Sequence, residues 1–139
     1  LDADRAASIS PNLRFTVDLL DLCASCDYIT IHVPATPSTK GMIGEAEIAA
    51  MKDGAAFLNF SRDTLVDNAA MRAGLESGKI RRYVTDFATP EVMEMEGALV
   101  LPHLGASTAE AEENCAEMAV REVMDYLETG TKTHCVNMK

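Results

Sequence analysis

The sequence predicts an α/β fold built on a parallel sheet, and three observations favour it. Four short apolar runs of strand length alternate along the chain with segments of helical pattern. The runs are apolar on both faces, as in parallel sheets covered from both sides. Each run is followed at once by polar, glycine or proline residues that end a strand. We therefore expect a doubly wound parallel sheet with flanking helices.

The first part of the chain is mixed in character. A turn is expected at residues 9–12, a short strand at 13–15 and a short helix at 17–26. Residues 27–34 are rich in β-branched side chains and predict a strand, which Pro34 stops.

The middle of the chain predicts two helices around a second strand. Residues 45–52 begin with acids and end with lysine, with Gly54 just beyond, as the helix dipole and C-cap preferences favour. Residues 55–60 form an apolar strand. A helix is expected at residues 68–77, ended by Gly78.

The last part predicts two strands and a long helix. The strands are expected at residues 82–87 and 98–101. Residues 107–110 (Ser-Thr-Ala-Glu) read as a capping box that opens an amphipathic helix reaching Glu128, closed by Gly130. Residues 131–139 form a polar tail.

Composition bounds the function. The 139 residues are one domain's worth of chain, 47% are hydrophobic, and the net charge is −10. An acidic chain argues against binding to nucleic acid or to an anionic membrane, since both need basic patches. No apolar run approaches the roughly 20 residues of a membrane span. We expect neither nucleic-acid nor membrane partners.

Four cysteines occur, at positions 23, 26, 115 and 135. Cys23 and Cys26 form a C-x-x-C, but a zinc site needs a second pair of ligands, and none is visible. We expect the two cysteines to act as small hydrophobic residues one helical turn apart, reduced in the cytoplasm. No metal site is predicted.

Three polar segments follow predicted strands, where parallel sheets bind their ligands. They supply Arg62, the pair Asp86 and Glu91, and His103. Taken alone, Arg62 is more typical of a surface loop, Asp86 and Glu91 of a solvated turn, and His103 of a helix-entry histidine bonded to backbone. Together they suit a dehydrogenase acting on a hydroxy acid, because arginine binds a carboxylate bidentately and histidine transfers protons near neutral pH. A neighbouring carboxylate orients the histidine ring and stabilises its charged form.

One expected feature of a dinucleotide-binding sheet is missing. Such sheets open with a strand, a G-x-G-x-x-G turn and a helix, and no G-x-G occurs in the chain. The chain is therefore either not a nucleotide-binding protein or the second half of one.

Several long motifs decide between these two possibilities. ITIHVP at residues 29–34 and TKGMI at residues 39–43 resemble the H-x-P and T-x-G-(M/L/I)-I segments of the D-isomer-specific 2-hydroxyacid dehydrogenase family. MKDGA at residues 51–55 and NFSR at residues 59–62 resemble its M-K-x-G-A and N-x-(S/A)-R-G segments.

The second half of the chain continues the resemblance. Asp86, with Glu91 five residues later, resembles the family's strand end, and residues 102–111 resemble its P-H-(I/L/V)-G-(A/G)-S-T-x-E-A. Residues 135–137 resemble its N-S-V-N segment. Two departures stand out: Asp63 follows the arginine where glycine is usual, and Val92 follows the glutamate where proline is usual.

The resemblance implies a Rossmann-type NAD-binding domain whose first strand and glycine loop lie outside this chain. Residues 1–130 would be its C-terminal portion and residues 131–139 a tail leading to another domain. It implies three catalytic residues: Arg62 binds the substrate carboxylate, and Glu91 pairs with His103. The implied cofactor, NAD, would be lined by Val33, Pro34, Phe60, Ser61, Arg62, Asp86, His103, Gly105 and Ala106, with Asp86 holding the nicotinamide carboxamide.

The implied activity is NAD-dependent oxidation of a D-2-hydroxy acid by a longer, cytoplasmic, homo-oligomeric (dimeric or tetrameric) protein. The members that oxidise 3-phospho-D-glycerate, in the first step of serine biosynthesis, are the most similar in sequence. Glycerate, lactate or hydroxypyruvate remain alternative substrates. A non-catalytic NAD-binding corepressor is an alternative of another class, since such proteins share the fold.

Overall fold

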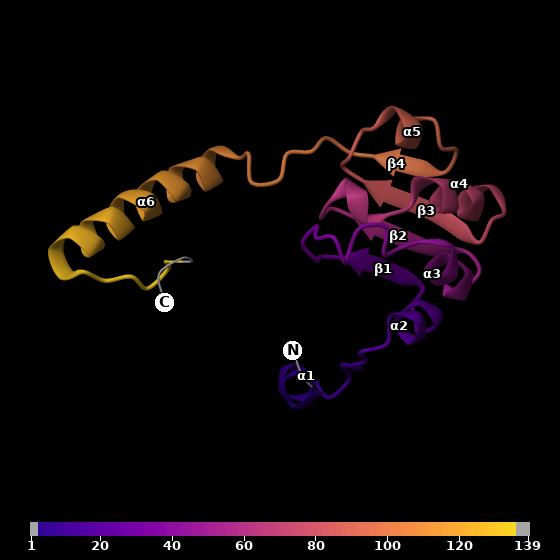
Figure 1. The fold of residues 1–139 in the computed structure, drawn as a ribbon, viewed down its shortest axis with the longest axis horizontal. Helices are drawn as coiled ribbons and strands as arrows, with labels where there is room; N and C mark the ends of the chain where they lie inside the picture. The colour runs from indigo at the N-terminus through magenta and orange to yellow at the C-terminus, as the bar shows by residue number, and fades with distance from the viewer. Residues whose placement is uncertain (1–2, 136–139) are drawn as a thin grey trace. The chain divides into compact units, whose positions relative to one another are not determined.

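The computed structural model describes residues 3–135 of the chain. It divides into two compact units, residues 1–102 and residues 103–139, and each is described by itself. The first unit contains a sheet with its helices, and the second contains one long helix (Figure 1).

The sheet of the first unit is entirely parallel, and its strands follow one another in chain order. Its four strands are β1 (Tyr28–Ile31), β2 (Ala55–Asn59), β3 (Ile80–Thr85) and β4 (Ala98–Val100). Because all four run the same way, their carboxyl ends lie along one edge. The polar segments predicted to carry the chemistry follow β2, β3 and β4 at that edge.

Helices connect the strands. They are α2 (Leu19–Ser25), α3 (Glu45–Ala50), the 3₁₀ turn η1 (Asp63–Leu65), α4 (Asn68–Glu76) and α5 (Pro90–Met93). Aspartates cap the starts of two of them: Asp18 accepts hydrogen bonds from the first turn of α2, and Asp67 does so for α4. Such caps satisfy backbone N–H groups that have no partner within the helix.

The core lies on one face of the sheet. Ile29, Phe57 and Tyr83 are directly opposite one another on β1, β2 and β3, and each is at most 5% exposed. The helices cover this face. Burying an apolar side chain of this size contributes about 1.5–3 kcal/mol, so this cross-strand row is a main source of the unit's stability.

The other face of the sheet differs from the expectation that both faces are covered. In the described part of the first unit, Tyr28, Thr30, Arg82 and Leu99 project from that face and are exposed. Crossovers between parallel strands of one sheet are nearly always right-handed, and in a sheet whose strands follow chain order that handedness places successive helices on a single face.

The second unit is built around α6 (Ala109–Thr129). Thr108 caps its start by accepting a hydrogen bond from the Ala111 N–H, and Gly130 ends it in the left-handed conformation. The helix has apolar side chains along its length, including Val120, Val123 and Leu127, and none of its residues is buried within the described structure.

Most predicted elements are confirmed, with boundaries moved by one to three residues, but some details were wrong. Residues 13–15 form no strand, since no neighbouring strand pairs with them, and the preceding α1 (Ala3–Ile9) was not predicted. The capping box was placed one residue early. Thr108 rather than Ser107 is the cap, so the third helical residue is Ala111, whose methyl side chain cannot return the hydrogen bond.

The α/β fold class is confirmed. Among the helices of the described residues, none has the length and apolar character needed to cross a membrane. The segment at residues 135–137 that resembles the family lies mostly outside the described residues.

Candidate active site

The loop that carries Arg62 is shaped by one buried asparagine. Asn59, the last residue of β2, is fully buried, and its side chain bridges the loop that follows. Its Nδ2 donates to the Arg62 carbonyl oxygen at 2.8 Å, and its Oδ1 accepts from the Ser61 N–H at 3.1 Å. A buried amide without partners would be costly, so these bonds select one loop conformation.

Two hydroxyl groups tie this loop to the neighbouring strand ends. Ser61 Oγ donates to the Val33 carbonyl oxygen at 2.7 Å, which joins the segments after β1 and β2. Thr85 is fully buried at the end of β3, and its Oγ1 donates to the Asn59 carbonyl oxygen at 2.9 Å. The segments that follow the first three strands are therefore held in fixed register.

Arg62 itself is exposed and extended, with φ −150° and ψ 141°. Its Nη1 donates to the carbonyl oxygen of Ser61 at 2.5 Å. The neighbouring Asp63, where the family has glycine, accepts a hydrogen bond from the Thr64 N–H at 2.7 Å and begins η1. The departure from glycine thus serves the local turn.

Glu91 lies in a short helix that was not predicted. Thr89 caps α5 by accepting from the Val92 N–H, and Pro90 occupies its first turn. Both are strong helix-start signals. Val92, where the family has proline, is 3% exposed and packs in the core.

Glu91 also contacts α4. Asn68 Nδ2 donates to Glu91 Oε2 at 2.8 Å, and Arg72 Nη2 donates to the Glu91 carbonyl oxygen at 2.9 Å.

Asp86 and Phe87 follow β3 directly. One carboxylate oxygen of Asp86, Oδ1, is buried. The Phe87 N–H donates to Thr85 Oγ1 at 3.2 Å, so the same threonine that holds Asn59 also fixes this turn. Burial raises the pKa of the nearby Tyr83 phenol above its ordinary value.

The remaining predicted residues belong to the second unit. His103, Gly105 and Ala106 lie in the segment between β4 and α6, and all three are exposed. Gly105 has φ +52°, a left-handed conformation that favours glycine. The chain enters this segment from Leu101, whose N–H donates to the Thr85 carbonyl oxygen at 2.8 Å.

Val33, Pro34, Phe60, Ser61, Arg62 and Asp86 follow the strands of the first unit, with Ser61 bonded to Val33, whereas Glu91 lies on α5 and contacts α4. A pocket of about 270 Å³ lies between the loops after β2 and β3 and the start of α4. None of these seven residues lines this pocket. It is lined by Lys40, Gly41, Asp63, Thr64, Val66, Asp67, Asn68, Tyr83, Phe87, Thr89 and Val92.

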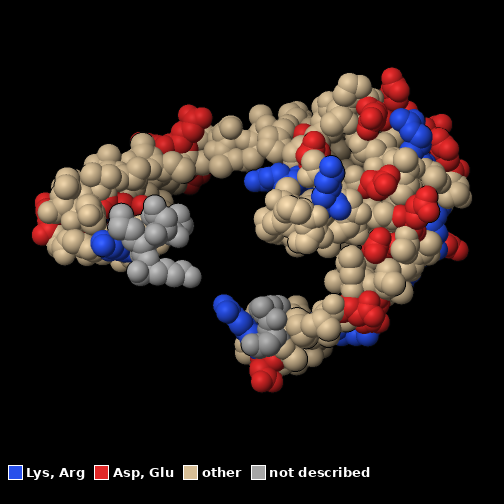
Figure 2. Space-filling model, in the orientation of Figure 1, with Lys and Arg blue, Asp and Glu red and all other residues tan. Residues whose placement is uncertain are grey.

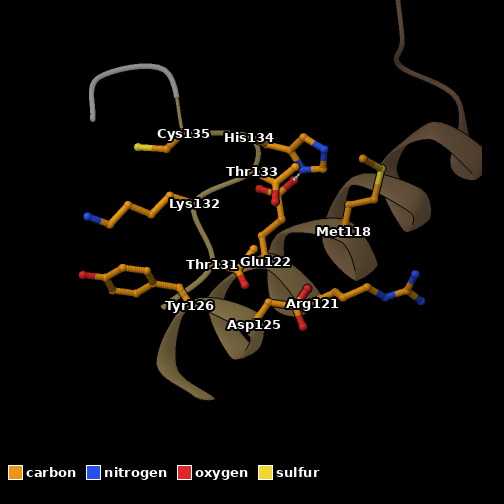
Figure 3. A pocket seen from close by; sticks show the side chains of 10 residues that line it. All are labelled: Met118, Arg121, Glu122, Asp125, Tyr126, Thr131, Lys132, Thr133, His134 and Cys135. Carbon is orange, nitrogen blue, oxygen red and sulfur yellow. Dashed lines mark hydrogen bonds and ion pairs between the residues drawn. The ribbon is translucent and has the colours of Figure 1, made fainter. Parts of the chain in front are cut away.

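A second hollow, of about 410 Å³, lies in the second unit between α6 and the segment that follows it (Figure 3). His134 Nδ1 and Glu122 Oε1 are 2.7 Å apart at its side. None of the residues predicted for the active site lines this hollow.

The surface agrees with the acidic composition. Figure 2 shows Asp and Glu side chains scattered over both units, with fewer Lys and Arg between them. The hydrogen bond with Lys79 lowers the pKa of the Asp53 carboxyl below its ordinary value.

The family model for the NAD binding domain of D-isomer specific 2-hydroxyacid dehydrogenases matches residues 3–105. The chain belongs to this family. The resemblance seen in the motifs is thereby confirmed, and so is the cofactor class that the family description carries.

Curated relatives of the chain include D-3-phosphoglycerate dehydrogenases. That of Haemophilus influenzae is 33% identical over 91% of this chain, and that of Methanocaldococcus jannaschii is 34% identical over 93%. The chain spans 33% and 26% of the length of these two proteins. Among solved structures, D-mandelate dehydrogenase of Rhodotorula graminis is similar in fold, with a TM-score of 0.79 over 91% of this chain and 38% of that one, at 23% identity.

Sequence reasoning missed three residues that shape the site. Asn59 was recognised only as part of the NFSR motif and given no role of its own, Thr85 was assigned only to a strand, and Asn68 only to a helix. A polar residue at the end of an otherwise apolar strand was the available signal for the first two. No signal in the sequence pointed to Asn68, because its partner lies 23 residues away.

Proposed function

We propose that the complete protein oxidises a D-2-hydroxy acid with NAD, and that its substrate is 3-phospho-D-glycerate, converted to 3-phosphohydroxypyruvate in serine biosynthesis. The observation that carries the activity is the buried Asn59, which holds the Arg62 loop at the carboxyl end of β2. The names of the relatives support the choice of substrate.

The described residues fit the reactive end of NAD. Asp86 offers a carboxylate oxygen at a strand end, which suits the N–H of a carboxamide. The ordered backbone of Val33 and Ser61 lies at the adjacent strand ends. NAD, when bound, accepts the hydride that leaves carbon 2 of the substrate.

In this mechanism Arg62 binds the substrate carboxylate with two hydrogen bonds and sets its orientation. His103 takes the proton of the C2 hydroxyl as the C2–H bond breaks and the carbonyl forms. Glu91 stabilises the imidazolium that results. General-base catalysis of this kind contributes roughly 10²–10⁴ in rate.

We also propose a location and an assembly. The four free cysteines favour the cytoplasm, and the family resemblance implies a homo-oligomer.

The activity is tested by NAD reduction with the complete protein on 3-phospho-D-glycerate, D-glycerate and D-lactate. We expect the highest kcat/KM with the phosphorylated acid. A higher kcat/KM with another acid would identify that acid as the preferred substrate. No turnover with any of the three acids would favour the corepressor-like alternative.

Arg62→Lys tests the carboxylate site. Lysine keeps the charge but loses the paired geometry. We expect kcat/KM to fall about 10- to 100-fold, since a hydrogen bond to a charged group contributes about 1.5–3 kcal/mol. NAD affinity should be nearly unchanged. Wild-type kinetics in Arg62→Lys would show that Arg62 does not bind the substrate carboxylate.

A further inference from the structure

Glu91 is held by α4 at two points. Asn68 Nδ2 donates to its carboxylate oxygen Oε2 at 2.8 Å, and Arg72 Nη2 donates to its main-chain carbonyl oxygen at 2.9 Å. Asn68 and Arg72 are four residues apart, so they lie on one face of the helix, one turn apart. A single helix face therefore fixes both the backbone and the side chain of Glu91.

The chemistry of the two donors matters. Asn68 is neutral, so its hydrogen bond orients the carboxylate without cancelling its negative charge. The charged donor, Arg72, contacts the main-chain carbonyl oxygen instead. An ionised carboxylate has two oxygens and about four acceptor sites, so a bond from Asn68 leaves capacity for an imidazole N–H.

The helix that carries Asn68 is itself well anchored. Asp67 caps it through the N–H groups of Ala69 and Ala70, and Met71 is fully buried in the core. Glu91, by contrast, is exposed on a helix of four residues. An exposed glutamate samples several rotamers unless a partner selects one. Asn68 supplies that partner from a rigid element.

We propose that Asn68 is a positioning residue for the reaction. It holds the Glu91 carboxylate in a single rotamer and leaves its negative charge intact. This inference rests on the proposed function, in which Glu91 stabilises the imidazolium.

The test uses the complete enzyme with Asn68→Ala and Asn68→Asp. Alanine removes the donor, and aspartate replaces it with an acceptor of the same shape that repels Glu91. We expect kcat to fall about tenfold in Asn68→Ala, a fraction of what general acid–base catalysis contributes, and at least as far in Asn68→Asp. The KM values for NAD and for the hydroxy acid should stay unchanged.

A double-mutant cycle shows whether Asn68 acts through Glu91. In a Glu91→Ala background, Asn68→Ala should have no further effect on kcat, because the carboxylate it orients is gone. Independent, multiplicative effects of the two substitutions would overturn the proposal.

Two controls separate the possible failures. Ser77→Ala removes a polar group at the other end of α4, where Ser77 Oγ donates to the Gly74 carbonyl oxygen, and should leave kcat unchanged. Thermal unfolding of Asn68→Ala should match the wild type, which excludes a general loss of structure. If the wild type turns over none of the hydroxy acids, the proposed function fails, and if Glu91→Ala is as active as an active wild type, the role of Glu91 and with it that of Asn68 fails. If Glu91→Ala is impaired but Asn68→Ala is not, only the positioning role fails.

Discussion

Single buried polar side chains set the shape of the site. Asn59 and Thr85 are both fully buried, and both make hydrogen bonds to the loops that follow their strands. Because leaving such groups without partners is costly, each acts as a template for one backbone conformation. The loops that carry Arg62 and Asp86, which we propose to act in the site, are therefore fixed by these two buried residues.

Cys23 offers a test at the same scale. It is fully buried in the core, and burial raises the pKa of its thiol above the ordinary value. Since the thiolate is the reactive form, a raised pKa leaves less of it at any given pH. We expect iodoacetamide at mildly alkaline pH to modify Cys23 more slowly than the exposed Cys115, as measured by peptide mass spectrometry.

The control for this experiment is the unfolded chain, in which both cysteines should react at similar rates. Equal rates in the folded protein would contradict the burial of Cys23 and its placement in the core.

At the scale of elements, α4 packs unusually close to its neighbours. A Cβ added at Gly74 would lie 2.9 Å from Ile48 Cγ2 of α3 and 3.1 Å from Ile80 Cγ1 of β3. Both neighbours are branched core side chains, with little room to move. Because Gly74 has no side chain, α4 can pack directly against both α3 and β3.

Gly74→Ala should therefore destabilise the protein. Alanine improves helix propensity by about 1 kcal/mol, but overpacking a core typically costs about 1–3 kcal/mol. We expect a net loss in the free energy of unfolding, measured with urea. A gain in stability, as at an open helical glycine, would show that the close contact does not exist.

At the scale of the whole molecule, the chain matches the family's NAD binding domain over residues 3–105 but has no glycine-rich turn in its sequence. Pyrophosphate binding relies on such a turn at a helix N-terminus, and no G-x-G occurs in the 139 residues. We expect calorimetry to show very weak NAD binding by this chain alone and clear binding by the complete protein. Micromolar affinity of the chain alone for NAD would contradict the requirement for a glycine-rich turn.

The amino-acid pattern by itself determined the fold class and the positions of the chemical groups. Apolar runs of strand length, glycine stops and motifs as long as NFSR can be recognised locally, because strand burial and turn geometry depend on neighbouring residues. Arg62, Asp86 and Glu91 follow their strands as expected, and the family match confirms the motifs.

Only the tertiary structure decided how those groups are held. The hydrogen bonds from Thr85 to Asn59 and from Asn68 to Glu91 join segments up to 26 residues apart. Such contacts depend on which strand ends lie side by side, and no local pattern encodes that. The four-residue helix that carries Glu91 was not predicted either. The exposed face of the sheet could not be predicted locally for the same reason. Apolar residues predict that a strand is buried, but not which element covers it.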